Sequence, residues 1–332
     1  LRAVSGADHG RDPRRWRAWR ERHKDRPEWG GRGEEVRRAD FAGVPLETVT
    51  VDTDPGGGTP GPDGRPAEKP EIFVLSPFGY SHGWFRPYLD EASDLVRLTY
   101  VTLPTVQEIT GSSGYGAAVP VYPVDKLARA LDALREAHGK ERIMILAAGP
   151  VVWIAEKYAL RYPKHTAGLI LVNGWLDRQA YADALLRVHA AGTASERWAA
   201  GLLLGKVDEV HGPEQGERMR RVFLTHALND RRDSEAWRLW RTTARDHGFV
   251  VVPPLDFTRH TRIETPTLFT FPDDSPFGGG SEEDLRRIRA SFRKPPPVTA
   301  LLRDSRGLAH AEDPEEFLRI LEGFLRHSGF VR

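Results

Sequence analysis

The chain has 332 residues, of which 39% are apolar and 29% are charged. That length suits one large α/β domain with an inserted subdomain, or two small domains, and the composition argues against wholesale disorder. Its 48 basic and 47 acidic side chains leave a net charge of +1, so no global field favours nucleic acid or a membrane surface as a partner. The absence of cysteine excludes disulfides, cysteine-ligated zinc, iron–sulfur clusters and thiol nucleophiles.

Two features of the sequence favour a cytoplasmic location. No stretch approaches about 18 uninterrupted apolar residues, the length that indicates a transmembrane helix. Residues 1–33 form a charged N-terminal extension, which is too polar for a signal peptide. Within it, Trp16 and Trp19 would share one face of a helix. We interpret this segment as a solvated helix docked on the main domain, with a nucleic-acid arm as the less favoured alternative.

Apolar runs and helical periodicity alternate along most of the chain. A Gly/Pro-rich stretch at 54–69 cannot form regular structure, so we expect a loop there. Strands are expected at 44–51, 71–75, 96–103, 142–147, 168–172, 267–271 and 298–302, and helices at 124–138, 152–162, 282–292 and 314–327. This order predicts an α/β fold, with a mainly parallel, doubly wound sheet covered by helices on both faces.

Residues 176–262 interrupt that alternation. They show helical and mixed patterns without a clear strand before 249–252, and the βα pattern resumes after them. We therefore predict a core formed by residues 34–175 and 263–332, with a helical cap inserted over 176–262.

Four segments resemble the α/β-hydrolase superfamily in their order and local wording. Residues 143–174 (IMILAAGPVVWIAEKYALRYPKHTAGLILVNG) are similar to the family's strand, nucleophile elbow, helix and following strand. Residues 74–93 (VLSPFGYSHGWFRPYLDEAS) resemble the strand and oxyanion loop. Residues 265–277 (TPTLFTFPDDSPF) and 304–325 (DSRGLAHAEDPEEFLRILEGFL) resemble the acid-bearing strand end and the histidine loop with its helix. The resemblance implies the α/β-hydrolase fold, with its cap at the predicted insertion.

The resemblance does not extend to the catalytic residues. The family's elbow reads G-x-S-x-G, with the nucleophile on a strained strand-to-helix turn. Gly149 falls at the nucleophile position, where it can adopt a positive φ easily but offers no side chain for attack. Ser275 falls at the acid position, although a one-residue slip would place Asp274 there, and Gly307 falls at the catalytic histidine. His310 matches a second histidine that packs locally in many members.

The oxyanion hole is lost as well. Its two donors are normally the backbone N–H after the nucleophile and one from the loop after the third strand. The first position is Pro150, which has no N–H, and Ser76-Pro77 replaces the family's His-Gly at the second. Ordinary ester or amide hydrolysis is therefore not expected.

Aromatic and histidine side chains surround the expected mouth of the pocket. Tyr80 and His82 follow the strand at 71–75, and we expect them to be catalytic through proton transfer. An aromatic plug and a hydrogen-bonded structural histidine are the alternative interpretations. Substrate contacts are expected from Phe78, Trp84, Gly149, Pro150, Trp175, His226, Trp240, Ser275 and Gly307.

Structural alternatives remain open in the cap. His226 and Asp230 are four residues apart on an expected helix and would equally form a surface pair. Trp237 and Trp240 would equally belong to the cap's own core, and Trp153 is expected in the main core. No H-x-x-E-H motif, paired-carboxylate array or dinucleotide loop is present, so we expect no metal and no cofactor.

A retained fold with a lost triad is similar to the α/β-hydrolase-fold enzymes of bacterial aromatic polyketide and anthraquinone-fused enediyne biosynthesis. That resemblance implies a cofactor-independent enzyme acting on a polycyclic aromatic by cyclisation, C–C bond formation or cofactor-free oxygenation. Two alternatives remain: a non-catalytic protein that binds the same kind of ligand, and a residual hydrolase with an unorthodox dyad. Fold analogy alone cannot separate these three functions.

Overall fold

The structure is a computed structural model, which describes residues 36–52, 69–76, 85–104, 124–174, 263–272, 282–292, 295–303, 310 and 313–331. The expected extension at 1–33 and the expected cap at 176–262 lie outside the described residues, as does most of the loop at 54–69. These three assignments stay predictions.

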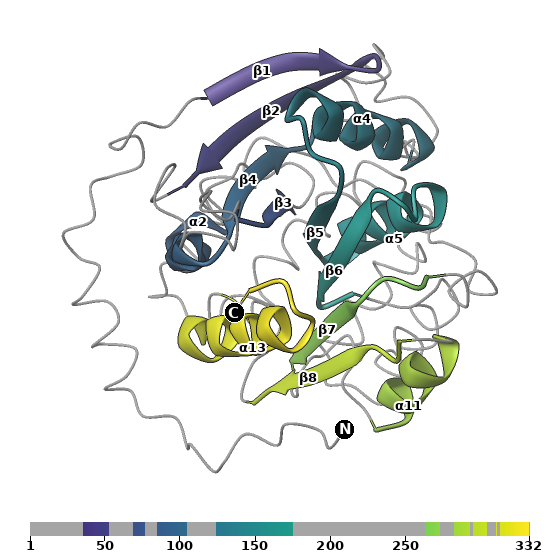
Figure 1. Cartoon of the computed structure of the whole chain (residues 1–332). Coiled ribbons are helices and arrows are strands. Elements are labelled where there is room, and N and C mark those ends of the chain that lie inside the picture. The colour runs from purple at the N-terminus through teal and green to yellow at the C-terminus, as the bar shows by residue number, and fades with distance from the viewer. Residues whose placement is uncertain are drawn as a thin grey trace, which may run out of the picture.

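An eight-stranded sheet forms the centre of the described core (Figure 1). Its strands are β1 (Val36–Phe41), β2 (Val44–Val51), β3 (Glu71–Leu75), β4 (Arg97–Thr102), β5 (Ile143–Ala148), β6 (Thr166–Val172), β7 (Thr267–Pro272) and β8 (Val298–Leu302). They lie side by side in the order β1-β2-β4-β3-β5-β6-β7-β8. All pairs from β4 across to β8 are parallel, and only β1 with β2 and β2 with β4 are antiparallel. The predicted mainly parallel sheet is confirmed.

Helices cover both faces of this sheet (Figure 1). On one face, α4 (Val124–Ala137), α5 (Val152–Arg161) and α11 (Glu282–Ser291) share a hydrophobic cluster with the strands. On the other, α2 (Arg86–Leu89) and α13 (Pro314–His327) share a second cluster. The chain is therefore doubly wound, as its βα order predicts. None of the described helices is long and apolar enough to cross a membrane.

The central strands are buried along their whole length because both of their faces are covered. All five residues of β3 and all six residues of β5 are buried, which is typical of parallel strands between two helical layers. This is the physical reason why the apolar runs at 71–75 and 142–147 identify strands in the sequence.

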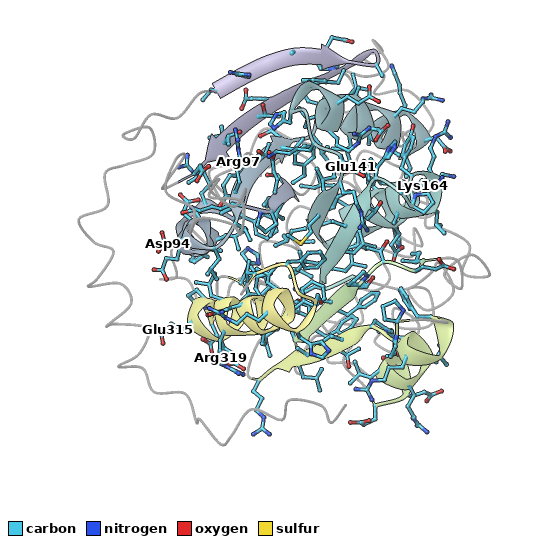
Figure 2. The ribbon with its side chains drawn as sticks, in the orientation of Figure 1. Asp94, Arg97, Glu141, Lys164, Glu315 and Arg319 are labelled. Atoms are coloured by element: carbon cyan, nitrogen blue, oxygen red, sulfur yellow. The ribbon has the colours of Figure 1, made fainter. Side chains whose placement is uncertain are left out.

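α13 begins at the predicted residue because its first turn is capped. The Asp313 side chain accepts a hydrogen bond from the Glu316 N–H at 3.1 Å, and the helix starts directly after this cap. Figure 2 shows Glu315 and Arg319 on the outer side of α13, whereas Phe317 is buried against the sheet. One apolar stripe thus fixes the rotation of the helix on its face of the sheet.

Sequence analysis missed β1, which is the edge strand next to β2. It pairs with β2 through the two-residue turn Ala42-Gly43, in which both residues have positive φ, +53° and +78°. Such a turn matches the twist of a hairpin but usually contains Asn-Gly or Asp-Gly. Because alanine stands at the first position here, the sequence carries no clear hairpin signal. The Gly43 N–H donates a hydrogen bond to the Asp40 side chain at 2.7 Å, which closes the turn.

A close approach between β6 and α5 holds the first turn of that helix in place. Gly174 follows β6, and a methyl group there would lie 2.8 Å from both Cγ atoms of Val152, the first residue of α5. The branched valine side chain is short and stiff, so it cannot move aside without shifting the helix. The glycine therefore sets the distance between β6 and the start of α5.

Replacing Gly174 by alanine is expected to lower the free energy of unfolding by about 1–3 kcal/mol, because the added methyl group overpacks a buried contact. Gly323→Ala is the matched control. Gly323 lies in α13, and a methyl group there meets no described atom within 4 Å. That variant is expected to be neutral or to gain about 0.5–1 kcal/mol from helix propensity. Urea denaturation of both variants measures the difference, and equal effects would contradict the proposed contact.

Candidate functional site

The turn between β5 and α5 keeps the shape of a nucleophile elbow. β5 ends at Ala148, and Gly149 follows with φ of +58°. A short 3-10 turn, Gly149–Val151, then leads directly into α5. The prediction that Gly149 takes a positive φ is confirmed. No atom of the described residues lies within 4 Å of a Cβ built on Gly149.

Three residues at the expected oxyanion positions, Pro150, Ser76 and Pro77, offer no free backbone N–H. Pro150 has no N–H to offer after the nucleophile position. At the end of β3, the Ser76 N–H already donates to the Val101 carbonyl at 3.1 Å, and Pro77 again has no N–H. A tetrahedral oxyanion would therefore find no backbone N–H from these three residues.

The ends of four parallel strands meet at this edge of the sheet. In register, Leu75 of β3 lies beside Ala147, Ala148 lies beside Val172, and Val172 lies beside Thr270. The segments that follow these strands therefore leave the sheet at the same edge. Ligand sites in open parallel sheets lie there, at the carboxyl ends of the strands.

Most of the sequence-predicted site residues lie outside the described residues. They are Phe78, Tyr80, His82, Trp84, Trp175, His226, Trp240, Ser275 and Gly307. Their roles stay predictions. Of the predicted set, the structure describes Gly149 and Pro150 and places both at the elbow turn.

Two hydroxyl groups at this edge were missed by the sequence analysis. Ser76 continues the ladder beyond β3 and lies beside Thr102 of β4, one step past the Leu75–Val101 pair. The Ser76 Oγ and the Thr102 Oγ1 are both buried, and neither has a hydrogen-bond partner. A serine or threonine at the end of an apolar strand gives no sequence signal for this, because the signal is the lack of a partner in space.

His310 packs locally, as expected. Its ring lies 4.5 Å from Phe85, 5.8 Å from Tyr88 and 6.2 Å from Phe317, measured between ring centroids. The side chain is buried. Trp153 is also buried, at the start of α5, which confirms the prediction that it belongs to the core.

Two buried carboxylates lie at the opposite edge of the sheet, where the parallel strands begin. Figure 2 labels Arg97 at the start of β4, and Glu141 and Lys164 two residues before β5 and β6. The first carboxylate is Glu71, whose side chain is fully buried. Its Oε1 accepts hydrogen bonds from the Thr99 hydroxyl at 2.6 Å and from His138 Nδ1 at 2.8 Å. Burial alone would raise the pKa of Glu71, but the hydrogen bonds from His138 and Thr99 outweigh it and hold that pKa below its ordinary value.

The second carboxylate is Asp132 on α4. Its Oδ1 accepts hydrogen bonds from Arg135 Nε at 2.8 Å, the Tyr158 hydroxyl at 2.9 Å and His165 Nδ1 at 2.8 Å. Burial raises the pKa of Asp132, but these bonds outweigh it and the pKa is lowered. Burial and the nearby Asp132 carboxylate together raise the pKa of Tyr158. Because its partners come from α4, α5 and the start of β6, this network joins three elements.

Neither network resembles a binding site. Both lie at the amino edge of the sheet, away from the elbow. Most of their polar atoms bind one another, although the buried Glu71 Oε2 has no hydrogen-bond partner among the described residues and only Lys140 Nζ nearby, at 3.7 Å. Among the described residues, no group of three or more histidine, aspartate or glutamate side chains could hold a metal ion. Their contribution is to stability.

The Glu71 network is expected to make stability fall in acid. Because the pKa of Glu71 is lower in the folded than in the unfolded chain, its stabilisation is fully present above the ordinary carboxyl pKa of 4.5 and is lost as pH falls through the folded-state value. At about pH 7, Glu71→Gln should lower the free energy of unfolding by about 1–3 kcal/mol, and this difference should shrink toward about pH 3. Denaturant titrations across that range measure it.

Glu141→Gln is the control for this experiment, since Glu141 is an exposed carboxylate near the same edge (Figure 2). It should leave stability nearly unchanged at every pH. A Glu71→Gln effect that stays constant from neutral to acid pH would show that the hydrogen-bond geometry matters but the charge does not.

Comparison with known proteins supports the fold. No known family description matches the chain. It is similar to Protein NDRG1-A of Xenopus laevis, with 23% identity over 252 residues that cover 73% of this chain and 59% of that relative. The chain thus spans about three fifths of that relative's length.

Among solved structures, it is similar to VinJ, with a TM-score of 0.61, 13% identity and coverage of 88% of this chain and 98% of VinJ. It is also similar to the epoxide hydrolase of Bacillus megaterium, with a TM-score of 0.56, 14% identity and coverage of 87% and 100%. A proline iminopeptidase of Mycobacterium smegmatis gives a TM-score of 0.56 at 15% identity, covering 89% of this chain and 98% of that one. With the strand order and the elbow turn, these likenesses show that the chain has the α/β-hydrolase fold.

Proposed function

We propose that this protein is a non-hydrolytic, cofactor-independent enzyme that uses the α/β-hydrolase pocket to act on a polycyclic aromatic substrate. The observation that carries the first part is the elbow turn, which keeps its positive φ while Gly149 presents no nucleophile. The fold itself does not decide the reaction, because the epoxide hydrolase and the iminopeptidase that it resembles are named for different chemistries.

The proposed reaction class is C–C bond formation by cyclisation, or oxygenation by molecular oxygen without a cofactor. An electron-rich aromatic has much of the required reactivity in its own structure. The protein then needs mainly to orient the substrate and to move a proton. Tyr80 and His82, in the segment directly after β3, are the residues we propose for that proton transfer.

The proposed ligand is flat because of what the site has lost and what surrounds it. Glycine at 149 and 307 and serine at 275 remove side-chain volume from the floor of the pocket. Phe78, Trp84 and Trp175 supply aromatic surface on which a fused ring system would stack. His226 and Trp240 would close the site from the cap.

A second candidate function is ligand binding without catalysis. One observation favours it. Among the described residues at this edge, Ser76, Gly149 and Asn173 directly follow β3, β5 and β6, and Pro272 is the last residue of β7. None of these side chains titrates near neutral pH. Incubating a hydroxylated anthraquinone with the protein under air, followed by mass spectrometry, separates the two functions. A protein-dependent product supports the enzyme, and tight binding without product supports the binding protein.

The first prediction of this proposal is the absence of esterase activity. Activated aryl esters should be hydrolysed no faster than by a heat-denatured control, because the nucleophile is missing and one lost oxyanion donor alone typically costs about 3 kcal/mol of transition-state stabilisation. Gly149→Ser should not restore turnover, since the base and the backbone donor at Pro150 would still be lacking. A burst of acyl-enzyme, or labelling by a serine-directed phosphonate, would show that a nucleophile exists elsewhere.

The second prediction concerns the ligand. A hydroxylated anthraquinone should quench tryptophan fluorescence with saturation, because it stacks on Trp84 or Trp175. The Trp84→Ala/Trp175→Ala double variant should lose most of this saturable quenching. Trp153→Phe is the matched control, since Trp153 is buried in the core and its loss should leave the affinity unchanged. Unchanged quenching in the double variant would place the ligand elsewhere.

A further inference from the structure

His310 occupies an aromatic enclosure between two helices on one face of the sheet. Phe85, immediately before α2, lies 4.5 Å from its ring, and Tyr88 within α2 lies 5.8 Å away in an edge-on orientation. From the other side, Phe317 of α13 lies 6.2 Å away, also edge-on. All four side chains are at least 98% buried. These separations fall in the range where aromatic rings attract one another, so His310 bridges α2 and α13.

Hydrogen bonds and a cation–π contact join the other side of α2 to β4. The Tyr100 hydroxyl of β4 donates to Asp90 Oδ1 at 2.6 Å. Asp90 Oδ2 accepts from Arg86 Nε and Nη2, at 3.3 and 3.2 Å, and the Arg86 guanidinium lies 5.9 Å from the Tyr100 ring centroid. α2 is only four residues long, too short to be stable alone. Its position therefore depends on these contacts with β4 and on His310.

The sheet alone does not connect the chain positions that His310 brings together. β3 leads to α2, and β8 leads to His310, but β5, β6 and β7 lie between these two strands. At about 4.8 Å per strand, four spacings separate them by about 19 Å. The contact between Phe85 and His310 nevertheless joins the two connections directly.

These two connections flank the proposed ligand site. Residues 77–84, which contain Tyr80 and His82, end at Phe85. Residues 304–309, which contain Gly307, end at His310. The described chain therefore resumes after these two segments at Phe85 and at His310, which contact each other.

We propose that His310 is a positioning residue, whose ring links Phe85 and α2 to Phe317 of α13 and so anchors the described ends of the two segments that carry residues of the proposed ligand site. The reference to a ligand rests on the proposed function. The mechanical link between α2 and the start of α13 does not, and it can be tested without any ligand.

Residue-resolved amide hydrogen exchange tests the link. The Tyr88 and Leu89 amides donate to the Phe85 carbonyl, and the Phe317 amide donates to the Asp313 carbonyl, all at 3.0 Å. His310→Ala should speed exchange at all three amides by about tenfold, because losing aromatic contacts shifts a local opening equilibrium by that order. Phe324→Ala is the matched control. It removes a buried aromatic ring from α13, seven residues beyond Phe317, and should leave these three amides unchanged.

Two further variants decide between a link and a general loss of packing. Phe85→Ala should speed exchange at the Phe317 amide, on the far side of His310, because the coupling is reciprocal. His310→Phe should restore slow exchange, since it keeps a ring in the enclosure. The proposal is overturned if His310→Ala affects only one helix, or if Phe324→Ala has the same effect on all three amides.

Ligand binding supplies the second readout. His310→Ala should weaken the binding of a hydroxylated anthraquinone by about tenfold, a change of the size expected from one lost aromatic contact, while Phe324→Ala should not. If the wild-type protein does not bind the anthraquinone but the exchange pattern appears, the proposed function fails and the positioning role stands. If binding occurs and His310→Ala leaves it unchanged, the positioning role fails and the proposed function stands.

Discussion

The conformation of one residue, Gly149, is the constraint on which the rest of the site depends. A chain that leaves the centre of a parallel sheet and enters a covering helix at once must reverse within one or two residues, and here it does so at φ +58°. A side chain at that position carries the strain of a left-handed backbone, and hydrolases accept that strain to project a nucleophile. Glycine adopts the turn without strain. The chain thus has the turn without the nucleophilic side chain that the turn presents in a hydrolase. The close contact between Gly174 and Val152 sets the distance between β6 and the start of α5.

The buried polar networks lie at the amino edge of the sheet, whereas the proposed ligand site is at the carboxyl edge. At the amino edge, Glu71 and Asp132 are buried carboxylates with three or more partners each, drawn from distant parts of the chain. These hydrogen bonds join α4 and α5 to the strands. At the carboxyl edge the described strand ends carry glycine, proline and unpaired hydroxyls instead. Polar groups left without partners there are available to something other than the protein's own packing.

The fold could be predicted from the sequence because short local patterns specify most of its strands and helices. The apolar runs of β3 and β5, the periodicity of α4 and the cap of α13 are each encoded within a few residues, and their order implies the sheet. β1 was missed because its turn uses alanine, and because its first five residues are exposed and show no apolar period. The Glu71 and Asp132 networks were missed for another reason. His138 is 67 residues from Glu71 and His165 is 33 residues from Asp132, so only the folded chain reveals them. The elbow could be located in advance because residues 143–174 resemble the strand, elbow and helix of the α/β-hydrolase superfamily.

A site without a nucleophile depends more on the rigidity of the surrounding residues than a hydrolase site does. In a covalent mechanism, much of the acceleration comes from the reacting side chain and its activating base. Where the protein supplies only orientation and proton transfer, the acceleration depends on how well the bound geometry is maintained, and misplacement by about 1 Å can cost about a hundredfold. Rigid contacts around the site then contribute directly to function. The aromatic enclosure of His310 has this character, because it joins connections from strands that the sheet keeps about 19 Å apart. Under the proposed function, the protein would act by positioning its substrate and not through a reactive nucleophile, and the buried contacts of His310 would then serve catalysis as well as packing.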